Sequence, residues 1–223
     1  MINYLIKVCC ISSLTEAKMA LSAGADLLGL VSEMPSGPGV IPLDQIEEIV
    51  VGLPADTKTV LLTSKHRHDD ILKQHNQVKT WGVQLVDKVA DSVLKELRKS
   101  LPSTRFIQVI HVKDEASISQ ALHYDNLVDM ILLDSGNPKA KIKTLGGTGK
   151  PHDWKISREI CARGSLPVLL AGGLSPENIL TARTVVQPSG FDICSGVRSD
   201  GKLNQNKLES FMKRVRSKEG KLT

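Results

Sequence analysis

Aromatic residues make up only 3% of this 223-residue sequence, so its core must be mostly aliphatic. Few side chains are therefore available to stack on nucleic-acid bases. The net charge of +5 suits an anionic ligand, but the lysines are scattered rather than gathered into a stripe. We therefore expect a small-molecule ligand and no nucleic-acid partner.

Long apolar runs and cysteine motifs are also missing. No run approaches the roughly 18 apolar residues that span a membrane, and the N-terminus has no signal-peptide pattern. The four cysteines form no CxxC pair and no zinc-site spacing with histidine. We expect a cytoplasmic protein with no membrane contact and no metal site.

What the sequence does contain is a regular alternation of apolar runs and helical patterns. The runs are continuously apolar, as in strands that are buried on both faces. Eight such strand–helix pairs predict an α/β fold, a single-domain (β/α)8 TIM barrel over residues 1–223. A doubly wound open sheet is the rival, but residues 9–13 lack the glycine-rich fingerprint that usually follows its first strand. The predicted strands are 4–9, 26–31, 57–62, 81–85, 105–110, 128–133, 166–170 and 191–194.

Two apolar runs end abruptly in small residues, at Gly172-Gly173 and at Ser195-Gly196. Glycine lets backbone N–H groups approach a ligand, and the predicted helix over residues 176–186 would add its unpaired first N–H groups. Phosphate sites of such barrels lie after strands seven and eight. We call these two strand ends the glycine-containing stops, and together they predict a phosphate-binding site.

Cys9 and Asp134 close predicted strands one and six, where a barrel places its active site. A thiol and a carboxyl that face each other across the mouth could act as base and acid. Lys7 shares the face of Cys9 and would favour its thiolate. The alternatives are a buried, inert thiol and an aspartate that caps a turn.

Three further motifs carry weaker signals. The segment 146–150 resembles a phosphate loop, but Pro151 stands where the P-loop pattern requires Ser or Thr. His66 and His68 lack a further ligand for a metal, and a solvated loop is the simpler interpretation. Three loop lysines could attract an anion or simply be solvated: Lys139, Lys141 and Lys143.

Taken together, these motifs resemble the phosphoribosylanthranilate isomerase family of tryptophan biosynthesis. They occur in the family's order, at the expected strand ends, over nearly the whole chain. The matching segments are 7–9, 132–135, 146–150 with 153–154, 170–174 and 195–197.

The resemblance implies a cofactor-free Amadori rearrangement of a phosphosugar, N-(5-phosphoribosyl)anthranilate. By it, Asp134 is the general acid that opens the ribose ring, and Cys9 is the general base that removes the C2' proton. We expect a monomer or a homodimer. The residues that would hold the phosphate are Gly147, Gly149, Gly172, Gly173, Ser195 and Gly196.

The chain departs from the family pattern at several positions. The family's loop after strand two carries an arginine for the anthranilate end, whereas residues 32–40 have no basic residue. Val86-Asp87 replaces a His-Gly pair, Cys10 replaces a glycine, and Arg198 replaces a glutamate. Arg198, His66 or a loop lysine could supply the missing cation, and Lys7 and Arg198 are the candidate residues for further contacts with the substrate. The alternative is a phosphosugar-binding barrel with another substrate or with no catalysis.

Overall fold

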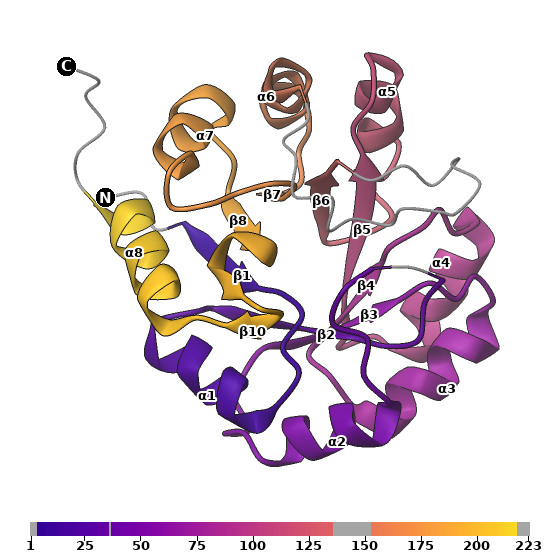
Figure 1. Ribbon diagram of the computed structural model, residues 1–223. Helices are drawn as coiled ribbons and strands as arrows, with labels where there is room; N and C mark the ends of the chain where they lie inside the picture. The colour runs from indigo at the N-terminus through magenta and orange to yellow at the C-terminus, as the bar shows by residue number, and fades with distance from the viewer. Residues whose placement is uncertain (1–3, 36, 136–152, 218–223) are drawn as a thin grey trace.

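The computed structural model describes residues 4–35, 37–135 and 153–217. Eight parallel strands close into a barrel in sequence order, with β8 hydrogen-bonded to β1. Helices surround the barrel, and the last helix lies beside the first (Figure 1). This confirms the predicted (β/α)8 barrel. The strands are β1 Leu5–Val8, β2 Leu27–Val31, β3 Thr59–Thr63, β4 Gly82–Leu85, β5 Arg105–His111, β6 Met130–Asp134, β7 Val168–Leu170 and β8 Gly190–Ile193.

The helices follow the strands in strict alternation. Ser13 caps the first helix by accepting a hydrogen bond from the Glu16 N–H, and Asp153 caps the sixth by accepting one from the Lys155 N–H. The helices are α1 Leu14–Ser22, α2 Leu43–Val51, α3 His68–Val78, α4 Asp91–Ser100, α5 Ala116–Leu122, α6 Trp154–Arg163, α7 Ile179–Val186 and α8 Gln205–Arg216.

One short unit after β8 was not predicted. A single 3-10 turn, η1 Ser195–Val197, leads into a hairpin of β9 Arg198–Ser199 and β10 Lys202–Leu203. The hairpin turns at Asp200-Gly201, both of which have a positive φ. An Asp-Gly pair is a strong hairpin signal, so the sequence did contain the evidence.

The barrel has two apolar layers. Large aliphatic side chains pack between the sheet and the helices, while a smaller cluster fills the barrel interior and includes Leu27, Val60, Ile107, Leu132 and Leu169. The interior is therefore a packed plug rather than a pore. Above it, at the carboxyl ends of the strands, lie polar interior residues, and these define the site.

Candidate active site

A cavity opens at the carboxyl ends of the strands. Both predicted catalytic residues line it, together with Gly172 and Gly173 of the first glycine-containing stop and Ser195 of the second. Its lining residues are Cys9, Cys10, Val31, Met34, Gly37, Pro38, Leu62, Gln84, Val86, Asp134, Ala171, Gly172, Gly173, Leu174, Asp192, Cys194 and Ser195. The structure thus brings together residues that are far apart in the sequence.

Cys9 follows β1 directly and is buried, with 6% of its surface exposed. Gly29 of β2 makes room for it, because a Cβ atom at that position would lie 2.9 Å from Cys9 Sγ and 3.0 Å from Lys7 Nζ. The thiol and the ammonium group therefore share the space above one glycine. This agrees with the prediction that Lys7 lies on the same face as Cys9.

Lys7 is fully buried and forms an ion pair with Asp192, whose Oδ1 lies 2.9 Å from Lys7 Nζ. The pairing of β1 with β8 places these two residues directly opposite each other. Burial alone would lower the pKa of Lys7, but the charge of Asp192 and the nearby thiols raise it above its usual range. Lys7 is therefore a permanent positive charge beside Cys9.

Asp192 is the counterpart of this charge in the cavity wall. Burial raises its pKa, and the nearby Asp134 raises it further, while Lys7 opposes both effects. Because the Lys7 ammonium lies at hydrogen-bonding distance, the pair is charged near neutral pH. Sequence reasoning missed Asp192, since its role depends on the register between the first and last strands.

Asp134 ends β6 and is 9% exposed, with its side chain at the cavity. Its Oδ1 accepts a hydrogen bond from the Ser135 N–H at 2.7 Å. Gly172 packs against this carboxyl group, because a Cβ atom there would lie 3.0 Å from Asp134 Oδ1. The candidate acid therefore adjoins the first glycine-containing stop.

The two stops form what we call the glycine loops, residues 172–174 and 195–197. Gly172 and Gly173 have φ values of 81° and 64°, which only glycine adopts without strain. Gly196 packs so closely on the Leu174 carbonyl that it leaves no room for a side chain. The two loops are therefore in contact, and both Gly173 and Ser195 line the cavity.

One expected feature of these loops is wrong. The helix after β7 begins at Ile179 rather than at Pro176. Asn178 accepts a hydrogen bond from the Ser175 N–H at 2.9 Å and donates one to the Gly173 carbonyl at 2.8 Å. These bonds hold residues 176–178 in a turn, and the helix starts only after it. An anion here would be bound by the loop backbone and the Ser195 side chain.

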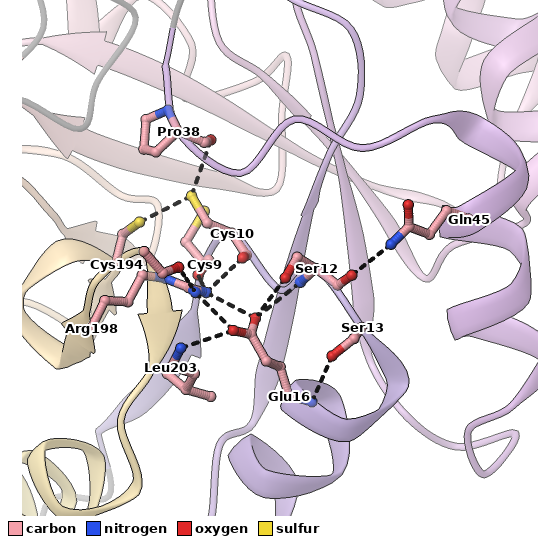
Figure 2. Close-up of polar contacts among 11 residues, drawn as sticks. Cys9, Cys10, Ser12, Ser13, Glu16, Pro38, Gln45, Cys194, Arg198 and Leu203 are labelled. Atoms are coloured by element: carbon pink, nitrogen blue, oxygen red, sulfur yellow. Dashed lines mark hydrogen bonds and ion pairs between the residues drawn. The ribbon is translucent and has the colours of Figure 1, made fainter.

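Arg198 lies outside the lining of the cavity. Its guanidinium group forms an ion pair with Glu16 at 3.0 Å and donates hydrogen bonds to the main-chain carbonyls of Cys9 and Cys10 (Figure 2). Its side chain is 9% exposed. In this structure Arg198 ties the segment after β1 to the turn after β8, and its predicted contact with substrate stays a prediction.

Opposite the glycine loops, the cavity has what we call the apolar wall: Val31, Met34, Leu62 and Val86. Gln84 lies beside it, is 3% exposed, and its Oε1 has no hydrogen-bond partner among the described residues. No lysine or arginine is found among the described residues that line the cavity. The wall thus combines an apolar surface with one neutral amide.

The remaining predicted motifs lie away from the cavity or outside the described residues. His66 contacts Asp87 and the Lys88 carbonyl, whereas His68 contacts Asp69 and Ser100. Over the described ranges, histidines, cysteines and carboxylates form no group of three or more that could hold a metal. Gly147, Gly149 and the three loop lysines (Lys139, Lys141 and Lys143) fall outside those ranges.

Comparison with known proteins gives consistent matches. A family model described as N-(5'phosphoribosyl)anthranilate (PRA) isomerase matches residues 6–214. N-(5'-phosphoribosyl)anthranilate isomerase 2 of Methanosarcina mazei is 35% identical over 218 residues, which cover 95% of this chain and 94% of that protein. None of the described helices has the length and apolar character to cross a membrane.

Solved structures agree. The phosphoribosyl anthranilate isomerase of Thermotoga maritima is 28% identical with a TM-score of 0.82, covering 96% of this chain and 99% of that one. A phosphoribosyl anthranilate isomerase in complex with reduced 1-(O-carboxyphenylamino)-1-deoxyribulose 5-phosphate is 25% identical, with a TM-score of 0.79 and the same coverage.

Proposed function

This chain belongs to the N-(5'-phosphoribosyl)anthranilate isomerase family, and we propose that it isomerises N-(5'-phosphoribosyl)anthranilate with Asp134 as general acid and Cys9 as general base. One observation carries this assignment: both side chains line a single cavity with the glycine loops. An acid, a base and a candidate phosphate site then face one bound substrate.

The substrate would lie across the cavity. Its phosphate would bind the backbone N–H groups of Gly172 and Gly173 and the hydroxyl of Ser195, with Gly196 holding the two loops together. Gly147 and Gly149 remain candidates for the same group. The anthranilate ring would pack on the apolar wall, which places the ribose between Cys9 and Asp134.

The reaction then needs two proton transfers. Asp134 donates its proton to the ring oxygen of the ribose as the bond from that oxygen to C1' breaks, which leaves a Schiff base between C1' and the nitrogen. The Cys9 thiolate next removes the proton from C2', and the electron pair moves to give an enolamine. The enolamine tautomerises to the ketone. No net redox change occurs, because C1' is reduced as C2' is oxidised, so no electron carrier is needed.

The surroundings of Cys9 support its role as a base. A thiolate is stabilised by a nearby positive charge, and Lys7 supplies one that is fully buried and stays protonated. Asp192 holds this ammonium group in place from the opposite strand. Lys7 and Asp192 are therefore positioning residues for Cys9 in this proposal.

The anthranilate carboxylate requires donors at the far side of the cavity. The Gln84 side chain is buried beside the apolar wall, and its NH2 group can donate hydrogen bonds to a carboxylate. We infer that Gln84 contacts this end of the substrate. His66, a loop lysine or Arg198 remains the candidate for the missing cation.

The proposed setting is the cytoplasm, and the state of assembly is a monomer or a homodimer. All four cysteines are free, which agrees with a reducing compartment. The contact surface of a dimer stays a prediction.

Purified protein should consume N-(5'-phosphoribosyl)anthranilate, which is followed by the loss of substrate fluorescence. The gene should also restore growth to a tryptophan-requiring isomerase mutant. A protein that binds the reduced product analogue but neither turns over substrate nor complements the mutant would be a non-catalytic phosphosugar-binding barrel. That outcome would contradict the proposal.

A further inference from the structure

We propose that Cys10 and Cys194 form a reversible oxidation site, in which a hydroperoxide joins the two thiols as a disulfide and inactivates the neighbouring isomerase centre. Neither residue has a role in the proton transfers proposed above. Both line the cavity, so a small oxidant that enters the active site reaches them.

The two sulfur atoms are already close. Cys10 Sγ and Cys194 Sγ lie 3.0 Å apart and point toward each other (Figure 2). The two residues follow β1 and β8, which are hydrogen-bonded neighbours in the barrel. A disulfide needs an S–S distance of about 2.05 Å, so bonding requires a movement of only about 1 Å.

The backbone at Cys10 is suited to glycine rather than to cysteine. Its φ is 61°, a left-handed conformation that is unfavourable for a residue with a side chain. The loop after β2 makes room for the side chain at Gly39, where a Cβ atom would collide with Cys10. The Cys10 thiol also lies 3.4 Å from the Pro38 carbonyl oxygen, which can accept its hydrogen bond. This thiol is therefore held in place despite an unfavourable backbone.

The charges around the pair make the two thiols unequal. The contact with the Cys10 thiol lowers the pKa of Cys194 despite its burial, and the charge of Arg198 lowers it further. The same contact raises the pKa of Cys10, as do Cys9 and burial. Cys194 is thus the better nucleophile, and Cys10 is the thiol that resolves the first oxidation product.

The chemistry balances with hydrogen peroxide as the oxidant. The Cys194 thiolate attacks one peroxide oxygen, the O–O bond breaks, and hydroxide leaves and is protonated to water, which gives a sulfenic acid. Cys10 sulfur then attacks Cys194 sulfur, the S–O bond breaks, and the hydroxide leaves as water with the Cys10 proton. Two thiols lose two electrons in total, and one peroxide is reduced to two waters.

The disulfide would disturb both ends of the catalytic centre. Cys10 adjoins the proposed base Cys9, and Cys194 adjoins the proposed phosphate ligand Ser195. Misplacing a catalytic group by about 1 Å costs about a hundredfold in rate. We therefore expect the oxidised protein to lose activity by about this factor and to regain it when dithiothreitol reduces the bond.

The full chain is treated with hydrogen peroxide, and its free thiols and its isomerase activity are measured separately. Titratable thiols in denatured protein should fall from four to two. Trypsin should release a linked pair of fragments, residues 8–18 and 184–198, that separates on reduction. The link is read by mass, so it is detected even if the proposed isomerase activity fails. A sulfenic or sulfinic acid without this link overturns the proposal.

Three variants identify the bonded cysteines. Cys10→Gly removes one thiol and fits the local backbone, and Cys194→Ser removes the other with little change in volume. Both should fail to form the link and should keep their own reduced activity during the same exposure. Cys161→Ser on α6 is the matched control and should behave like the unaltered chain. Peroxide inactivation of Cys10→Gly at the unaltered rate would mean that Cys9 is the target and would refute the switch.

Discussion

The glycine loops and the apolar wall face each other across one cavity, but they are built in different ways. In the proposed function the loops bind through the backbone, and their shape depends on Gly172, Gly173 and Gly196, each of which has a conformation or a contact that disfavours a side chain. The wall would bind through side chains, here Val31, Met34, Leu62 and Val86 with Gln84. Side chains can be exchanged without altering the backbone. The glycines expected from the family resemblance are present in these loops, whereas the expected arginine and His-Gly pair are absent at the wall.

The proposed acid and base stand between these two regions, and their loss should have the largest effect. Cys9→Ser and Asp134→Asn should each lower kcat by about 10²–10⁴-fold, because each removes one positioned proton-transfer group. KM should change little, since neither group supplies most of the binding energy. Steady-state kinetics by substrate fluorescence measures both values.

Matched controls for these variants are Cys161→Ser and Asp69→Asn, which replace the same residue types outside the cavity. Both should retain full activity. If Cys9→Ser and Asp134→Asn were as active as these controls, the catalytic assignment would be wrong. The glycine loops and the apolar wall would then have no catalytic pair between them.

Arg198 follows the second glycine loop, and its replacement tests whether this residue contacts the substrate or acts only in the fold. Arg198→Ala leaves the Glu16 carboxylate buried without its partner, which costs about 3–5 kcal/mol of stability. Urea unfolding should detect this loss. An effect on KM alone, with stability unchanged, would instead show that Arg198 contacts the substrate.

The pH dependence of stability sharpens this test. Burial alone would raise the pKa of Glu16, but the hydrogen bonds from Arg198, Leu203 and Ser12 lower it. A carboxyl with a lowered pKa in the folded state stabilises the protein above its unfolded value of about 4.3, and this stabilisation is lost as the pH falls through the folded value. Below about pH 4 the difference in stability between the chain and Arg198→Ala should therefore narrow.

The sequence predicts the barrel well because its evidence is local. Continuous apolar runs identify the buried strands, and the residues at their carboxyl ends, such as Cys9 and Asp134, could be named before their positions were known. The glycine loops were predicted for the same reason, since a backbone turn depends on the residues in the turn itself.

The rest of the site depends on long-range geometry. The Lys7–Asp192 pair requires the register of β1 against β8, and Gly29 matters only because two side chains from β1 lie above it. The late start of α7 follows from hydrogen bonds of one side chain, Asn178. No pattern along the chain reports such contacts.

The apolar wall can be tested by restoring a cation. Pro38 belongs to the loop after β2 and lines the cavity, so Pro38→Arg would place a guanidinium group in the loop where the family resemblance implies an arginine. A charge-assisted contact with the anthranilate carboxylate contributes about 1.5–3 kcal/mol, so KM should fall by about ten- to a hundredfold.

Pro35→Arg adds the same charge to the same loop outside the lining of the cavity and is the matched control. It should leave KM unchanged. An unaltered KM in Pro38→Arg would mean that another cation already meets the carboxylate. The substrate would then have its full set of contacts at the wall as well as at the glycine loops.

The glycine loops themselves can be tested with two glycines of similar backbone. Gly172 and Gly201 have φ values of 81° and 76°, but a Cβ atom would contact Asp134 and Ser135 only at Gly172, whereas nothing lies within 4 Å at Gly201. Each change to alanine should cost about 1–2 kcal/mol of stability from backbone strain alone.

Gly172→Ala should in addition lower kcat/KM by about tenfold, because the loss of one phosphate contact costs about 1.5 kcal/mol. Gly201→Ala should leave kcat/KM unchanged. Equal kcat/KM values in the two variants would mean that the loop after β7 does not hold the phosphate. The cavity would then have no end that binds its ligand through the backbone.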